Sequence, residues 1–196
     1  VQDQNGNLWV GTWGQGVLLF DVENNKLVDV LNNRDQNHYH RSNHIRQLFI
    51  DGKNSLWVGT NGGGVSKVNT STYECYTWSQ LIDPSVPMET AYCFEIFEDP
   101  RGDIWIGTFV GGLLKLDKES NNFRLIPNPN NSEAQTKNGI LSIALDDEGM
   151  LLLGSNGGGL FRFNPSTEEF IANYKYDATN INSCLLYTSP SPRDRY

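Results

Sequence analysis

The sequence predicts an all-β fold: a partial β-propeller of about four blades in an open arc, each blade a four-stranded antiparallel meander. A tryptophan-bearing, glycine-rich motif returns about every 48 residues. Short apolar runs separated by polar or glycine-rich turns fill the space between its copies, as expected for strands. Four strands of about 4 to 7 residues with their turns need roughly 40 to 50 residues, the size of one blade.

The first copy, DQNGNLWVGT, runs from Asp3 to Thr12, and the turn and apolar run after it reach Phe20. No strand precedes Asp3, so the first blade is expected to lack its inner strand. Val1 stands where a complete chain would carry Met, and we therefore expect a fragment.

The second copy, DGKNSLWVGT, begins at Asp51 and is the first with a complete set of four apolar runs. These predict strands over Ile45–Ile50, Leu56–Thr60, Val65–Val68 and Tyr73–Trp78. In a meander, the first and third turns lie on one face of the ring. The glycine-rich second turn and the loop to the next blade then share the other face.

The third copy, DPRGDIWIGT, begins at Asp99, and the fourth, DDEGMLLLGS, begins at Asp146 with Leu152 in place of tryptophan. Blade boundaries follow from the spacing. The predicted units are 1–43 for the partial first blade and its loop, 44–91, 92–138 and 139–176 for the next three, and 177–196 for the start of a truncated blade with an artefactual or disordered tail.

The recurring residues favour structural roles. The aspartates suit tight turns in which a carboxylate accepts backbone N–H bonds, the tryptophans suit packing between blades, and the glycines leave room for close sheet packing. A catalytic carboxylate pair would be singular rather than periodic. The structural set is Asp3, Trp9, Gly11, Asp51, Trp57, Gly59, Asp99, Trp105, Gly107, Asp146 and Gly154.

Composition limits the function. The 15 basic and 23 acidic residues give a formal charge of −8, which disfavours nucleic acid. No 18-residue apolar run occurs, so contact with a membrane is expected only through segments outside the chain. Three scattered cysteines make no disulfide scaffold, and neither a metal nor a cofactor is predicted.

The repeated motif resembles the two-component regulator propeller repeat over residues 1 to about 173. That resemblance implies the periplasmic sensor region of a hybrid histidine kinase of Bacteroidetes type, on the periplasmic side of the inner membrane. It also implies an oligosaccharide ligand, downstream sensor and kinase domains, and a homodimer of the full receptor. The propeller itself would not be an enzyme.

Candidate ligand contacts lie on the face that carries the glycine turns. Aromatic planes with polar edges suit sugar rings. A histidine-rich loop on this face has three open interpretations: a solvated loop, a ligand contact, or a zinc site through His40 and His44. The predicted ligand set is Trp13, Gln15, His38, Tyr39, His40, Arg41, Asn61 and Phe109, although Trp13 and Phe109 could equally be buried between blades.

Two other functions stay open. One is a propeller enzyme acting on a carbohydrate or a cyclic lactone, with acid–base groups from the histidine loop. The other is a protein-interaction scaffold. An open arc would expose inter-blade surface at both ends, so the isolated segment is expected to be poorly soluble.

Overall fold

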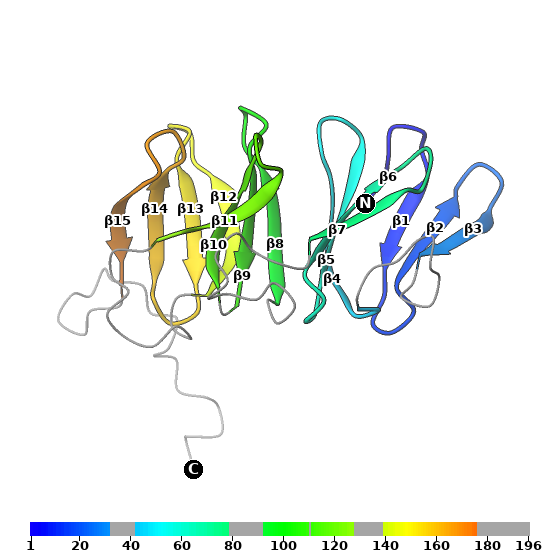
Figure 1. Ribbon diagram of the computed structural model, residues 1–196, viewed down its shortest axis with the longest axis horizontal. Helices are drawn as coiled ribbons and strands as arrows, with labels where there is room; N and C mark the ends of the chain where they lie inside the picture. The colour runs from blue at the N-terminus through cyan, green and yellow to red at the C-terminus, as the bar shows by residue number, and fades with distance from the viewer. Residues whose placement is uncertain (32–41, 79–91, 110, 128–138, 176–196) are drawn as a thin grey trace, which may run out of the picture.

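The computed structural model describes residues 1–31, 42–78, 92–109, 111–127 and 139–175 (Figure 1). Every regular element in these segments is a strand, and the strands form one three-stranded and three four-stranded antiparallel sheets. Blade 1 holds β1 (Leu8–Gly11), β2 (Val17–Asp21) and β3 (Lys26–Leu31); blade 2 holds β4 (Ile45–Ile50), β5 (Ser55–Thr60), β6 (Val65–Asn69) and β7 (Cys75–Trp78); blade 3 holds β8 (Cys93–Glu98), β9 (Ile104–Thr108), β10 (Gly112–Asp117) and β11 (Asn122–Ile126); blade 4 holds β12 (Ile140–Leu145), β13 (Leu151–Ser155), β14 (Leu160–Asn164) and β15 (Glu169–Tyr174).

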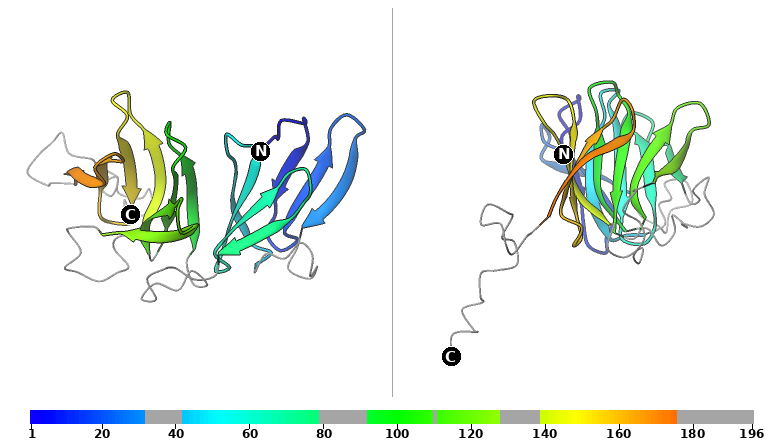
Figure 2. Two further views of the ribbon diagram at one scale, coloured as in Figure 1. Left: turned by 45° about the horizontal axis from the view of Figure 1, so that its top comes forward. Right: turned by 90° about the vertical axis from the view of Figure 1, so that its left-hand side faces the viewer.

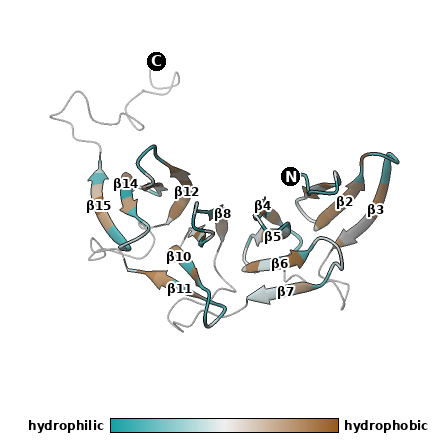
Figure 3. Cartoon of the chain, turned by 90° about the horizontal axis from the view of Figure 1, so that it is seen from above, coloured by the Kyte–Doolittle hydropathy of each residue, from teal (hydrophilic) through white to brown (hydrophobic). Residues whose placement is uncertain are grey.

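Seen from above, the four sheets fan around one side of a common axis (Figure 3). Strands β4, β8 and β12 lie nearest the axis and pack side by side, while β7, β11 and β15 lie outermost. The left view in Figure 2 shows the same succession of sheets from blade 1 to blade 4. The predicted open arc of antiparallel meanders is confirmed.

Blade 1 has three strands, as predicted. Val1 and Gln2 pair antiparallel with β1. Val1 and Trp9 exchange two hydrogen bonds, at 2.8 and 2.9 Å, and Gln2 forms an isolated β-bridge with Leu8. These two residues occupy the place beside β1 that β4, β8 and β12 hold in the other blades.

The core is divided among the blade interfaces. One apolar cluster lies between blades 1 and 2, one between blades 2 and 3, and one between blades 3 and 4. Trp9, Trp57 and Trp105 each belong to the cluster between their own blade and the next, and each is at most 1% exposed. An indole can bury roughly 200 Å², so these rings are major parts of the interfaces.

The glycine two residues after each tryptophan allows neighbouring blades to approach closely. A Cβ on Gly59 would lie 2.5 Å from the Cys93 sulfur of blade 3, and one on Gly11 would lie 2.6 Å from the Ile45 side chain of blade 2. Distances this short are incompatible with a side chain, so the backbone of one blade packs directly against the inner strand of the next.

The predicted strand over Tyr73–Trp78 begins two residues late, at Cys75. Tyr73 adopts a φ of +63°, and its amide donates to the Asn69 carbonyl at 2.8 Å. Tyr73 therefore closes the turn before β7, and its ring meets Trp9 edge to face at a centroid distance of 6.0 Å. No local sequence pattern predicts this contact between Tyr73 of blade 2 and Trp9 of blade 1.

The arc has two faces with different connections. We call the side with the aspartate-motif turns, such as β4–β5, the turn face, and the side with the glycine turns, such as β1–β2 and β5–β6, the loop face. The described segments contain no helix of the length and apolarity needed to cross a bilayer.

Candidate functional site

Each aspartate of the repeat organises its own turn. In the first three copies the Oδ1 atom accepts two backbone N–H bonds, and the Oδ2 atom accepts the indole N–H of the tryptophan six residues later. The Nε1–Oδ2 distances for Trp9, Trp57 and Trp105 are 2.9, 2.9 and 3.1 Å. The aspartates are thus anchors for the inter-blade rings.

The fourth copy keeps the aspartate but changes its partner. With Leu152 in the tryptophan position, Arg162 Nε donates to Asp146 Oδ2 at 2.8 Å from the adjacent strand β14. The pKa of Asp146 is lowered, most by the hydrogen bond from the Met150 amide and also by Arg162, and these effects outweigh burial, which acts in the opposite direction. A cation therefore substitutes for the indole at this turn.

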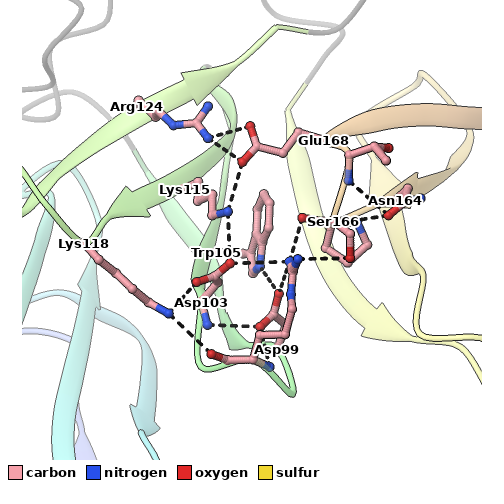
Figure 4. A network of polar contacts seen from close by, with 12 residues as sticks. Asp99, Asp103, Trp105, Lys115, Lys118, Arg124, Asn164, Ser166 and Glu168 are labelled. Carbon is pink, nitrogen blue, oxygen red and sulfur yellow. Dashed lines mark hydrogen bonds and ion pairs between the residues drawn. The ribbon is translucent and has the colours of Figure 1, made fainter.

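Charged side chains on the turn face join blade 3 to blade 4 (Figure 4). Glu168 of blade 4 accepts from Lys115 at 2.9 Å and from Arg124, both of blade 3, and Arg101 donates to the Pro165 carbonyl at 2.6 Å. Lys115 also pairs with Asp103 at 3.0 Å. Every charged group in this network is matched by an opposite charge or an acceptor. We therefore assign the network to the interface between blades 3 and 4 rather than to a binding site.

The predicted ligand residues divide into two groups. Trp13, Gln15, Asn61 and Phe109 all lie at the loop face, in or beside the turns after β1, β5 and β9. The loop residues, His38, Tyr39, His40 and Arg41, lie outside the described residues.

Trp13 is fixed in place yet open to solvent. Trp13 forms an isolated antiparallel β-bridge with His44 of blade 2. The amides of Gly14 and Gly16 donate to the Asn43 carbonyl at 2.9 and 3.2 Å. The indole meets the His44 ring at a centroid distance of 4.8 Å and remains 64% exposed. An immobilised, exposed indole is suited to stacking on a planar or ring-shaped ligand.

Each inner strand carries an irregularity in register at its second residue, near the loop face. The pairing shifts between Ile45 and Gln47 in β4, and the same shift recurs in β8 and β12. The residues left without a paired residue on the neighbouring strand are Arg46, Phe94 and Leu141. Bulges of this kind re-aim a side chain, and the sequence shows no periodic feature that would have identified them.

Two of these bulge residues meet across blades 2 and 3. The Arg46 guanidinium carbon lies 4.3 Å from the Phe94 ring centroid, and Phe94 stacks on Phe109 at 5.7 Å with an interplanar angle of 27°. Arg46 also lies 5.7 Å from the Trp13 centroid, and its Nε donates to Asn61 Oδ1 at 2.8 Å. We call Trp13, Arg46, Asn61, Phe94 and Phe109 the loop-face cluster.

Beside the cluster, two inner strands exchange a polar contact. Gln47 Nε2 donates to Glu95 Oε1 at 2.9 Å. Burial raises the pKa of the Glu95 carboxyl, with a smaller opposing effect from the Ile96 amide. Within the described segments, no group of three or more histidine, cysteine, aspartate or glutamate side chains is arranged to hold a metal ion.

Comparison with known proteins gives one family and several structures. Residues 1–14 and 40–62 match the family described as two component regulator propeller. No curated protein matches the sequence significantly. The chain is 24% identical to the extracellular domain of a proposed one component system from B. thetaiotaomicron, with a TM-score of 0.73, over 93% of this chain and 22% of that one.

Two further structures share the fold. The extracellular domain of a proposed hybrid two component system from B. thetaiotaomicron gives 23% identity and a TM-score of 0.66 over 87% of this chain and 22% of that one. Virginiamycin B lyase from Staphylococcus aureus gives 15% identity and a TM-score of 0.64 over 91% of this chain and 55% of that one. The chain spans about a fifth of the length of the B. thetaiotaomicron domains, and the likenesses establish a propeller fold.

The matched residues cover the whole of the first and second motifs, including Asp3, Trp9, Asp51 and Trp57. The structure shows that the corresponding aspartate–tryptophan pair recurs at Asp99 and Trp105. The chain is therefore similar to the two component regulator propeller family in both matched motifs, and its third motif has the same geometry.

Proposed function

We propose that this propeller segment senses an extracytoplasmic ligand for a signalling receptor, and that the ligand is an oligosaccharide bound at the loop face. The family description and the extracellular B. thetaiotaomicron neighbours support the receptor part. In that receptor the segment lies on the periplasmic side of the inner membrane and acts without catalysing a reaction itself.

The observation that carries the ligand part is Trp13. Its backbone is tied to blade 2, and yet its indole is 64% exposed. A solvent-exposed aromatic ring has a net cost in water that a stacked sugar face would remove. The adjacent Asn61 and Gln15 supply polar edges for hydroxyl groups.

Signalling would follow from differential binding. A ligand shifts a two-state receptor only as far as its affinities for the two states differ. The propeller would pass this bias to downstream sensor and histidine kinase domains in a homodimer. The sequence that adjoins these residues in the gene is the first test, because a transmembrane helix and kinase motifs are expected there.

Calorimetric titration of the protein as encoded with a panel of oligosaccharides tests the ligand. We expect at least one member to bind and Trp13→Ala to weaken that binding about tenfold or more. Tyr76→Ala is the matched control, because Tyr76 is 53% exposed on the outer strand β7. Flat heats across the panel, or equal losses in both variants, would contradict the proposal.

The likeness to virginiamycin B lyase, whose structure was solved with quinupristin, supports an enzymatic alternative. The same titration distinguishes it from a sensor when quinupristin is added to the panel. An enzyme acting on a carbohydrate or a cyclic lactone would convert its ligand during the titration, whereas a sensor would return it unchanged. A protein-interaction scaffold would bind a protein partner and ignore every sugar.

A further inference from the structure

The loop face carries a guanidinium group that has no acidic partner among the described residues. The described segments contain four arginines, and three of them pair with aspartate or glutamate: Arg101, Arg124 and Arg162. Within those segments, Arg46 forms no ion pair, and its one side-chain hydrogen bond runs from Nε to Asn61. Arg46 is therefore the one arginine of the described segments that no carboxylate of those segments neutralises, in a chain with a formal charge of −8.

The guanidinium is held in a fixed orientation by three blades. Phe94 of blade 3 stacks beneath it at 4.3 Å, Trp13 of blade 1 lies 5.7 Å away, and Asn61 of blade 2 holds Nε at 2.8 Å. The two terminal nitrogens, Nη1 and Nη2, make no hydrogen bond within the described part of the chain. Arg46 is exposed, so these nitrogens face solvent as a preorganised fork of donors.

We propose that Arg46 binds an anionic group, a carboxylate or a sulfate, on a ligand whose ring stacks on Trp13. This inference rests on the proposed ligand-sensing function and narrows its ligand to an acidic sugar. The planar fork matches the two oxygens of a carboxylate or sulfate, and such bidentate contacts are among the stronger hydrogen bonds in proteins. Little entropy is lost on binding because the aromatic rings already hold the side chain.

The overall negative charge does not oppose this contact strongly. At physiological ionic strength, charges more than about 8 Å apart are largely screened, so the local cation determines the interaction. The nearby Glu95 is bonded to Gln47 rather than to Arg46.

The test compares ligands that differ only in charge. Trigalacturonate is paired with its neutral methyl ester, glucose 6-sulfate is paired with glucose, and sodium sulfate probes the bare ion. Binding to the protein as encoded is measured by calorimetry, and the Nε–H resonance of Arg46 is followed by NMR after labelling the arginines with ¹⁵N. We expect acidic probes to shift this resonance and to bind more tightly than their neutral partners.

Arg46→Gln removes the charge and keeps a polar side chain, while Arg46→Lys keeps the charge without the planar fork. We expect Arg46→Gln to weaken binding of the acidic probe about 10- to 100-fold and to leave the neutral ester within about twofold. Arg46→Lys should fall between wild type and Arg46→Gln. Lys53→Gln, at the exposed turn after β4 on the opposite face, makes the same change in net charge and should alter neither ligand.

The outcomes separate the two proposals. Neutral sugars that bind while no acidic probe shifts Arg46 would overturn the anion site and leave the sensing function standing. Sulfate or glucose 6-sulfate that binds at Arg46, with no response to any oligosaccharide, would support the anion site and contradict the oligosaccharide ligand. Equal losses for Arg46→Gln and Lys53→Gln, or no binding of any probe, would overturn the anion site.

Discussion

Replacing Trp57 by phenylalanine is expected to destabilise the fold by about 3 kcal/mol. Trp57 is 1% exposed, donates its indole N–H to Asp51 at 2.9 Å and stacks on Trp78 at a centroid distance of 5.3 Å. Phenylalanine keeps much of the ring packing but removes the donor. Loss of a buried hydrogen bond to a charged acceptor costs about 2 kcal/mol, and the unfilled part of the indole site costs about 1 kcal/mol.

Urea unfolding followed by far-UV circular dichroism measures this change, with free energies obtained by linear extrapolation. Leu152→Ala is the matched control at the corresponding position of blade 4, where the aspartate bonds to Arg162 instead. Because Leu152 is only half-buried, we expect a loss of about 1 kcal/mol. A loss below about 1 kcal/mol for Trp57→Phe, with an unchanged dependence on urea, would refute the view that the aspartate–tryptophan bond holds the interface.

Three other predictions concern the interfaces and turns. Gly59→Ala is expected to cost about 1–3 kcal/mol because its Cβ would lie 2.5 Å from the Cys93 sulfur, whereas Gly52→Ala, with ordinary contacts, should change the urea midpoint little; equal effects would contradict the close-packing argument. The pKa values of Asp51 and Asp99 are lowered, because hydrogen bonds and cations outweigh the opposing effect of burial, which is the largest single influence. Their stabilisation is therefore complete above about pH 4, their unfolded value, and lost as the pH falls through the folded values; unfolding free energies that stay constant from pH 5 to pH 2 would count against it. Burial raises the pKa of the Cys93 thiol, so iodoacetamide at pH 8 should modify it at least about 100-fold more slowly in the native protein than in urea. Equal rates, measured by mass spectrometry, would show that this interface is open.

The repeat predicted the architecture because spacing constrains topology. Tryptophans 48 residues apart, with four apolar runs between copies, leave few arrangements besides stacked meanders. The backbone conformation of the motif turns also follows from the sequence, because glycine and asparagine adopt positive φ more readily than other residues. The fourth position of each motif has positive φ, at Gly6, Asn54, Gly102 and Gly149.

The candidate site was only partly predictable. Trp13 and Asn61 were found because they occupy the variable position of a repeated turn, whereas Arg46 and Phe94 were missed. Their importance arises from a shift in strand register and from contact between blades, and neither appears in a local pattern. The bond between Asp51 and Trp57 was missed for a related reason, since the path of the turn decides which acceptor reaches the indole.

Each interface takes its indole from one sheet and its inner strand from the next. An in-frame duplication or loss of one 48-residue unit therefore leaves every surviving junction with both halves, wherever within the unit the breakpoint falls. Genes built from such units can change their copy number and still place an inner strand against each motif tryptophan, although contacts specific to one junction, such as Glu168 with Lys115, would be lost. The number of repeats can then change during evolution while the contact between a motif tryptophan and the next inner strand is kept.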